Sequence, residues 1–189
     1  MKPWKIDSVE ILHQGWSTLS AFFIKTHDGH EVVRREVFDS GDGVAAFLYN
    51  PEKRKVLLTK QFRIAAYANG HPDGYLLEVC AGLIDDLSRE EAIIKEIWEE
   101  TGVKTKAVNY LFDVYVTPGA HKEKLSLYTC VYNDSMRIGQ GGGVEEENEE
   151  IEVLEFSFKE AIELLSTGKI QDAKTVILLQ HAINARLIY

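Results

Sequence analysis

The chain has 189 residues, of which 45% are hydrophobic and 27% charged, a composition that suits one globular domain with or without a small appendage. Its net charge of −9 argues against a general nucleic-acid-binding protein, which would present a basic face. No apolar run reaches the roughly 18 residues of a membrane span, and the start lacks the apolar core of a signal peptide, so we expect a cytoplasmic protein without a membrane partner. Cys80 and Cys130 lie in apolar stretches and are expected to be buried thiols.

Strand-like segments occupy much of the chain, because β-branched and aromatic residues recur in short runs. They cover residues 20–26, 31–38, 43–49, 56–62, 75–79, 110–116, 125–132 and 151–156. The first two flank His27-Asp28-Gly29-His30, which predicts a hairpin with an Asp-Gly turn. The third and fourth flank Asn50-Pro51-Glu52-Lys53, which predicts a second hairpin.

Helices are expected at residues 89–101, 158–166 and 172–187, where apolar residues follow a helical spacing. Residues 139–150 combine a glycine run with carboxylates and are expected to form a mobile surface loop. The pattern predicts an α+β fold with a mixed β-sheet packed between helices. We expect residues 1–40 to form an N-terminal strand region and residues 41–189 the main domain.

The segment from Glu78 to Val103 carries the most information about function. A strand enters a glycine loop, and the loop leads into the helix at 89–101. Ser88 and Glu91 have the spacing of a capping box, and Gly102 is placed to end the helix in a left-handed conformation.

Three glutamates of this helix, Glu96, Glu99 and Glu100, have the spacing i, i+3, i+4 and therefore project from one side. Carboxylates this close repel each other unless they are solvated or bridged by a cation, and Mg²⁺ favours such oxygen ligands. A metal site and a solvated acidic helix face both fit the spacing alone.

The run Lys95-Glu96-Ile97-Trp98-Glu99-Glu100-Thr101-Gly102-Val103 resembles the core of the Nudix box, R-E-U-x-E-E-x-G-U with U a bulky aliphatic residue, and Gly82 matches its leading glycine. The chain departs from the box in three ways: the loop is one residue shorter, Lys95 replaces the arginine, and Ser88 stands where the first glutamate is found. The shorter loop and the lysine resemble the GDP-mannose hydrolase branch of the family. Further similarity to that branch lies at residues 34–37, 61–63, 78–85, 141–145 and 172–175.

The resemblance implies a Mg²⁺ site, with Mn²⁺ as the alternative ion. Its ligands would be Glu96, Glu100 and the backbone carbonyl of Ala81. Glu147 would be a further ligand or a base, and Glu146, Glu149 and Glu150 are the alternatives for that role. Glu99 either assists catalysis or pairs with Lys95.

The resemblance also implies substrate contacts. Arg63 would bind the phosphates, for which a guanidinium fork is suited. The other implied substrate contacts are Trp16, Arg34, Arg35, Glu36, Gly82, Glu146 and Lys174. Glu123 matches a substrate-proximal or catalytic glutamate. The simpler readings are a core position for Trp16, an exposed helix residue for Lys174 and a surface loop residue for Glu123.

The function that the resemblance implies is Mg²⁺-dependent hydrolysis of the pyrophosphate bond of a nucleoside diphosphate sugar of the GDP-mannose type. The products would be a nucleoside monophosphate and a sugar 1-phosphate. An ADP-ribose or ADP-sugar pyrophosphatase, and a silent Nudix domain that only binds a nucleotide sugar, are the alternatives. A homodimer formed through the N-terminal hairpin region is also implied.

Overall fold

A computed structural model describes residues 4–26, 29, 31–144 and 150–189. The chain divides into two compact units. One comprises Met1–Asp42 and Tyr115–Leu125, and the other comprises Gly43–Val114 and Ser126–Tyr189.

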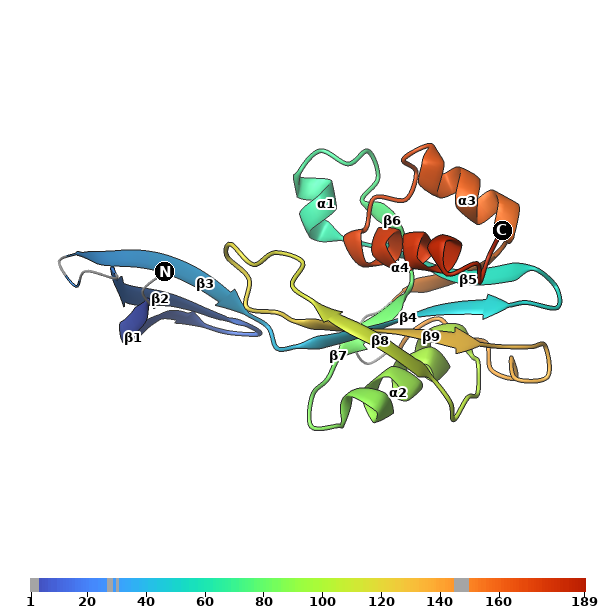
Figure 1. Cartoon of the computed structure of the whole chain (residues 1–189), viewed down its shortest axis with the longest axis horizontal. Helices are drawn as coiled ribbons and strands as arrows, with labels where there is room; N and C mark the ends of the chain where they lie inside the picture. The colour runs from blue at the N-terminus through green and yellow to red at the C-terminus, as the bar shows by residue number, and fades with distance from the viewer. Residues whose placement is uncertain (1–3, 27–28, 30, 145–149) are drawn as a thin grey trace. The chain divides into compact units, whose positions relative to one another are not determined.

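The first unit is built on a three-stranded antiparallel sheet (Figure 1). Its strands, in the order β1-β2-β3, are β1 (Lys5–Gln14), β2 (Thr18–Lys25) and β3 (Val32–Asp39). The 115–125 segment joins β3 through backbone hydrogen bonds, because Phe38 N donates to Ala120 O and Lys122 N donates to Phe38 O. Every residue of β1 is exposed, so this sheet has little core of its own.

The second unit contains a seven-stranded sheet in which β10-β5-β4-β9-β8 lie side by side, β6 pairs with β5, and β7 pairs with β4. Its strands are β4 (Gly43–Asn50), β5 (Lys55–Phe62), β6 (Tyr75–Glu78), β7 (Cys80–Leu83), β8 (Asn109–Val114), β9 (Leu125–Val131) and β10 (Ile151–Ser157). Its helices are α1 (Ile64–Ala68), α2 (Arg89–Thr101), α3 (Phe158–Ser166) and α4 (Ala173–Asn184).

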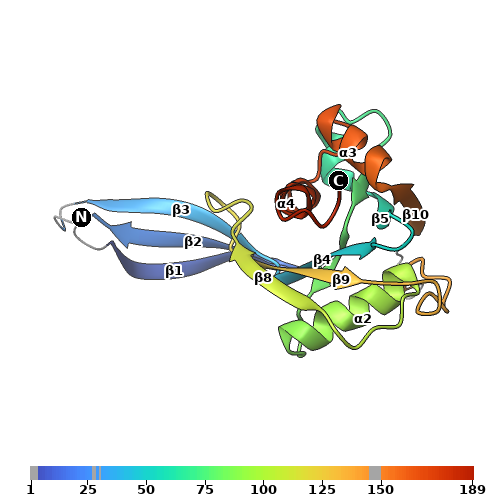
Figure 2. The same ribbon diagram turned by 45° about the vertical axis from the view of Figure 1, so that its right-hand side comes forward.

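Helix α2 covers one face of this sheet, and α3 and α4 lie on the other (Figures 1 and 2). Ala92, Ile93 and Ile97 of α2 pack in a buried cluster with alternate residues of β4 and β9. Full burial of a side chain such as Ile93 contributes on the order of 1.5–3 kcal/mol, so this cluster fixes α2 against the sheet.

The expected α+β fold, a mixed sheet packed between helices, is confirmed. Helices α2 and α3 have the expected bounds, and α4 is shorter at both ends than expected. Strand β1, strand β7 and helix α1 were not predicted. Residues 27 and 28 of the predicted Asp-Gly turn lie outside the described residues, while β2 and β3 pair antiparallel on either side.

Both cysteines are free and buried, as expected. Within the described ranges, no helix is long and apolar enough to cross a membrane.

Candidate active site

Helix α2 begins and ends where its capping residues predict. The Ser88 hydroxyl accepts a hydrogen bond from Glu91 N at 3.3 Å, and the Glu91 carboxylate accepts one from Ser88 N at 3.1 Å. Gly102 ends the helix at φ 69°, and its N–H donates to Trp98 O. The three acidic side chains of α2 are therefore held on a helix with defined ends.

Glu96 and Glu100 converge on the backbone of Ala81 and Gly82 in β7. Ala81 N donates to a carboxylate oxygen of Glu100 at 3.3 Å, and Glu100 is buried. A Cβ on Gly82 would lie 2.2 Å from the carboxyl carbon of Glu96 and 2.5–2.6 Å from its oxygens. Position 82 must therefore be glycine for the Glu96 carboxylate to occupy this place, a requirement of close approach and not of backbone angle.

Negative charge in this region also acts on Cys80, the neighbour of Ala81. Burial raises the pKa of the Cys80 thiol well above its ordinary value, and the charges of Glu100 and Glu96 add to that rise. The thiol is thus protonated and poorly suited to bind a cation.

Glu99 contacts Lys95: the Lys95 Nζ lies 2.8 Å from a Glu99 oxygen and 3.8 Å from Glu96. Of the two interpretations of Glu99, the ion pair with Lys95 is the contact present in the structure. Its catalytic role stays a prediction.

The glycine run after β9 is bound to the end of α2. Gly142 N donates to Glu100 O at 2.9 Å, and Gly143 N donates to Glu99 O at 3.1 Å. These bonds satisfy carbonyls that a helix end leaves without partners. The described part of the predicted mobile loop, residues 139–144, is therefore docked on the helix that carries the carboxylates.

Arg63 and Lys174, both predicted substrate contacts, meet at one carboxylate. Arg63 donates to Glu78 from Nε at 2.7 Å and from Nη2 at 2.9 Å, and Lys174 Nζ donates to the same side chain. Lys174 also donates to Asp172 at 3.0 Å, so it is not the exposed helix lysine of the simpler interpretation. Glu78 and Asp172 were not among the predicted site residues. The sequence offered one signal for Glu78: it is a carboxylate at the end of an apolar strand, where a buried charge requires a partner.

Five predicted residues, Trp16, Arg34, Arg35, Glu36 and Glu123, belong to the first unit. Trp16 is 81% exposed, which excludes a core position in the described chain. Arg34 pairs with Glu36 at 2.7 Å, and Arg35 donates to Arg34 O.

Glu123 lies at one end of a short series of polar contacts. Its carboxylate lies 3.7 Å from His121 Nδ1, and His121 Nε2 lies 3.0 Å from the Ser40 hydroxyl. The roles of the first-unit residues in the reaction stay predictions.

The predicted loop glutamates Glu146, Glu147 and Glu149 lie outside the described residues, whereas Glu150 is described and exposed. Across residues 4–26, 29, 31–144 and 150–189, no three His, Cys, Asp or Glu side chains are grouped to hold a metal ion. The described chain thus offers two side chains, Glu96 and Glu100, beside the backbone of Ala81 and Gly82 in β7. This set fits a hard divalent cation, because its donor atoms are oxygens and the lack of a Cβ at Gly82 lets the Glu96 carboxylate lie against β7.

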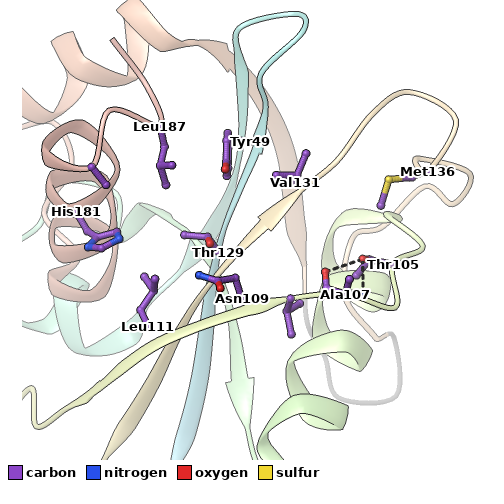
Figure 3. A pocket seen from close by; sticks show the side chains of 12 residues that line it. Tyr49, Thr105, Ala107, Asn109, Leu111, Thr129, Val131, Met136, His181 and Leu187 are labelled. Atoms are coloured by element: carbon purple, nitrogen blue, oxygen red, sulfur yellow. Dashed lines mark hydrogen bonds between the residues drawn. The ribbon is translucent and has the colours of Figure 1, made fainter.

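A pocket of about 440 Å³ lies elsewhere in the second unit, between α4 and the β8 edge of the sheet (Figure 3). Tyr49, Thr129 and Val131 line it from β4 and β9, and His181 lines it from α4. Along β4 and β9, the residues that line the pocket alternate with those that pack under α2. The pocket therefore lies on the face of the sheet opposite to α2. None of the predicted site residues lines it.

Comparison with known proteins agrees with this geometry. Residues 39–179 match the NUDIX domain, a span that contains α2, β7, Arg63 and Lys174. The chain belongs to the Nudix family. Nudix hydrolases use a divalent metal ion, consistent with the oxygen ligands described above.

Relatives with high identity extend over nearly the whole Nudix chain. A protein of Pectobacterium atrosepticum is 49% identical over 94% of both chains, and one of Escherichia coli is 43% identical over 95% of this chain and 94% of its own. A protein of Cronobacter sakazakii is 51% identical over 82% of each chain. Each of the three is named GDP-mannose pyrophosphatase.

Proposed function

We propose that this Nudix enzyme hydrolyses GDP-mannose to GMP and mannose 1-phosphate, with Mg²⁺ as its cation and Mn²⁺ as a substitute. The observation that carries the proposal is the convergence of Glu96 and Glu100 on Ala81 and Gly82, with Arg63 close enough for the Glu100 charge to influence it. The names of the full-length relatives support the choice of base and sugar.

Each residue has a defined task in the proposed reaction. Water attacks one phosphorus atom, the bond to the bridging oxygen breaks, and that oxygen leaves with the other phosphate. Glu96, Glu100 and the Ala81 carbonyl would hold the divalent cation, which would supply charge neutralisation and lower the pKa of water. Arg63 binds phosphate oxygens through the donors that Glu78 leaves available. Glu123 or Glu147 takes the proton of the water.

The test is a substrate panel of GDP-mannose, GDP-glucose, ADP-ribose, ADP-glucose and dinucleotides, assayed with Mg²⁺, with Mn²⁺ and with EDTA. Phosphatase treatment exposes the monoester products as free phosphate. Metal-dependent turnover led by GDP-mannose supports the proposal. Preference for ADP-ribose refutes the substrate and keeps the mechanism, and binding without turnover on any substrate indicates a silent Nudix domain.

We further propose that two copies of the chain associate through the three-stranded sheet of the first unit. Strand β1 exposes Ile6, Val9 and Ile11, each at least half exposed, and a three-stranded sheet with so little core gains stability by burying such residues. Light scattering at micromolar concentration tests this. A monomeric mass refutes it, and a dimer that Ile11→Lys dissociates supports it.

A further inference from the structure

Glu78 is a buried carboxylate at the end of β6, with only 2% of its side chain exposed. A charge at such a position is costly unless it is fully hydrogen-bonded and paired. Both oxygens are occupied: Oε1 accepts from Arg63 Nε at 2.7 Å, and Oε2 accepts from Arg63 Nη2 at 2.9 Å and from Lys174 Nζ. The Arg63 pair has the parallel, two-bond geometry that fixes a guanidinium plane.

Lys174 completes the charge balance and is itself held in place. Its side chain is 12% exposed, and its ammonium group also donates to Asp172. The second oxygen of Asp172 accepts from Thr175 N at 3.0 Å and from the Thr175 hydroxyl at 2.6 Å, which caps helix α4. Val79 N donates to the Thr175 hydroxyl oxygen at 2.8 Å, so the network joins the start of α4 to the β6–β7 junction.

The network keeps Glu78 ionised. Burial by itself would raise the pKa of Glu78, but the hydrogen bond from Arg63 and the charges of Lys174 and Arg63 outweigh that effect and hold the pKa below its ordinary value. Burial also lowers the pKa of Lys174, but the charges of Glu78 and Asp172 raise it by more, so the pKa lies above its ordinary value. A charged acceptor holds Arg63 more firmly than a neutral one would.

Arg63 has donors left after this pairing. Glu78 takes Nε and one Nη2 hydrogen, so three N–H groups of the planar guanidinium remain, two of them side by side on its end edge. The side chain is 41% exposed, unlike the Glu78 beneath it, and the negative charge of Glu100 influences it. The Arg63 side chain is thus close enough to the candidate metal ligand Glu100 for their charges to interact.

We propose that Glu78 is a positioning residue: it holds one edge of the Arg63 guanidinium so that the other edge meets the pyrophosphate, while Lys174 balances its charge. This inference rests on the proposed function, because it requires a phosphate ligand. A solely structural ion network that fastens α4 to the sheet would have the same contacts, but it would not connect Glu78 to substrate binding through Arg63.

The test is a double-mutant cycle on GDP-mannose with Glu78→Gln, Arg63→Gln and the double variant. Glu78→Gln should lower kcat/KM by roughly 10- to 100-fold and raise KM, because a misplaced arginine binds the phosphates poorly. Partial unfolding would lower the apparent kcat and leave KM unchanged. In the Arg63→Gln background the same substitution should cost less than about threefold, since its effect passes through the arginine.

Two further variants keep the test decisive. Glu78→Asp retains the buried charge and draws the carboxylate back by about 1.5 Å, the length of one C–C bond. It should fold even if Glu78→Gln does not, and it should still raise KM. The matched control is Asp113→Asn, which removes a carboxylate paired with Arg89 at 3.1 Å but outside this network, and should keep the wild-type KM.

The outcomes separate this proposal from the proposed function. Unmodified enzyme that turns over no nucleotide sugar would refute the function and the positioning role together. Two results would refute the positioning role alone in an enzyme whose unmodified form is active. One is losses of kcat/KM from Glu78→Gln and Arg63→Gln that multiply in the double variant, and the other is a Glu78→Asp enzyme with wild-type KM.

Discussion

Replacing Gly82 with alanine should damage activity far more than stability. The new Cβ would lie 2.2 Å from the Glu96 carboxyl carbon, so that carbon must move about 1.2 Å to reach an ordinary contact of 3.4 Å. Glu96 can make this movement, because the atoms in conflict are the end of a flexible side chain. A displacement of about 1 Å at a reacting centre can lower the rate on the order of 100-fold.

The assay is kcat for GDP-mannose hydrolysis as a function of Mg²⁺ concentration, together with the midpoint of urea denaturation. Gly82→Ala should lower kcat roughly 100-fold and destabilise the fold by no more than about 1–3 kcal/mol. Glu96→Asp shortens the acid and removes the conflict, so Gly82→Ala should add little further loss in that background. Full activity of Gly82→Ala, or equal losses in both backgrounds, would refute the close approach of Glu96 to Gly82.

Gly141→Ala is the matched contrast, because its conflict is with the main chain. A Cβ there would lie 2.4 Å from Glu100 O, and the residue has φ 67°. Neither the helix carbonyl nor the left-handed backbone yields easily, so we expect a loss of stability of at least about 1–2 kcal/mol. If Gly141→Ala were as stable as the unmodified protein, the docking of the glycine run on α2 would be wrong.

Three further substitutions test the site. Glu100→Gln should reduce turnover by orders of magnitude and keep the fold, because it removes a ligand charge and preserves shape; unchanged kcat would exclude Glu100 as a ligand. Ser88→Glu should change kcat less than tenfold but destabilise α2 by about 1 kcal/mol through loss of the cap, and a large gain in kcat would show that the box needs a glutamate there. The folded pKa of Glu78 lies below its ordinary value of 4.5, so the stability that this carboxylate contributes is present above about that pH and is lost as the pH falls through the folded pKa. The denaturation midpoint of Glu78→Gln should therefore fall less steeply on acidification than that of the unmodified protein.

Helix α2 shows how much of the site local chemistry could predict. Its N-cap, its C-cap and the placement of Glu96 and Glu100 on one side all depend on residues within one or two turns. The bounds were therefore readable from spacing alone. Strand β7 was missed because Cys80–Leu83 reads as a glycine loop, and only its pairing with β4 makes it a strand.

Charge pairs were less predictable, since they join distant parts of the chain. Arg63 and Lys174 were predicted as substrate contacts, but their common partner Glu78 lies 15 and 96 residues away from them. No local pattern indicates that pairing. Trp16 shows where a general rule is wrong. A lone aromatic residue is usually buried, but this one is exposed.

The charges at the site lead us to expect that this acidic chain binds a polyanion only with a cation present. Arg63 and Lys174 are matched by Glu78 and Asp172, and Lys95 is matched by Glu99. Glu96 and Glu100 place two carboxylates beside the position proposed for the pyrophosphate, where their charge would oppose that of the phosphates. Two like charges 4 Å apart repel by about 4 kcal/mol at an effective dielectric constant of 20, more than the available edge of Arg63 is expected to offset. Removing the cation should therefore abolish nucleotide-sugar binding as well as turnover, and neutralising Glu100 as glutamine should restore part of the binding in EDTA while leaving the enzyme inactive.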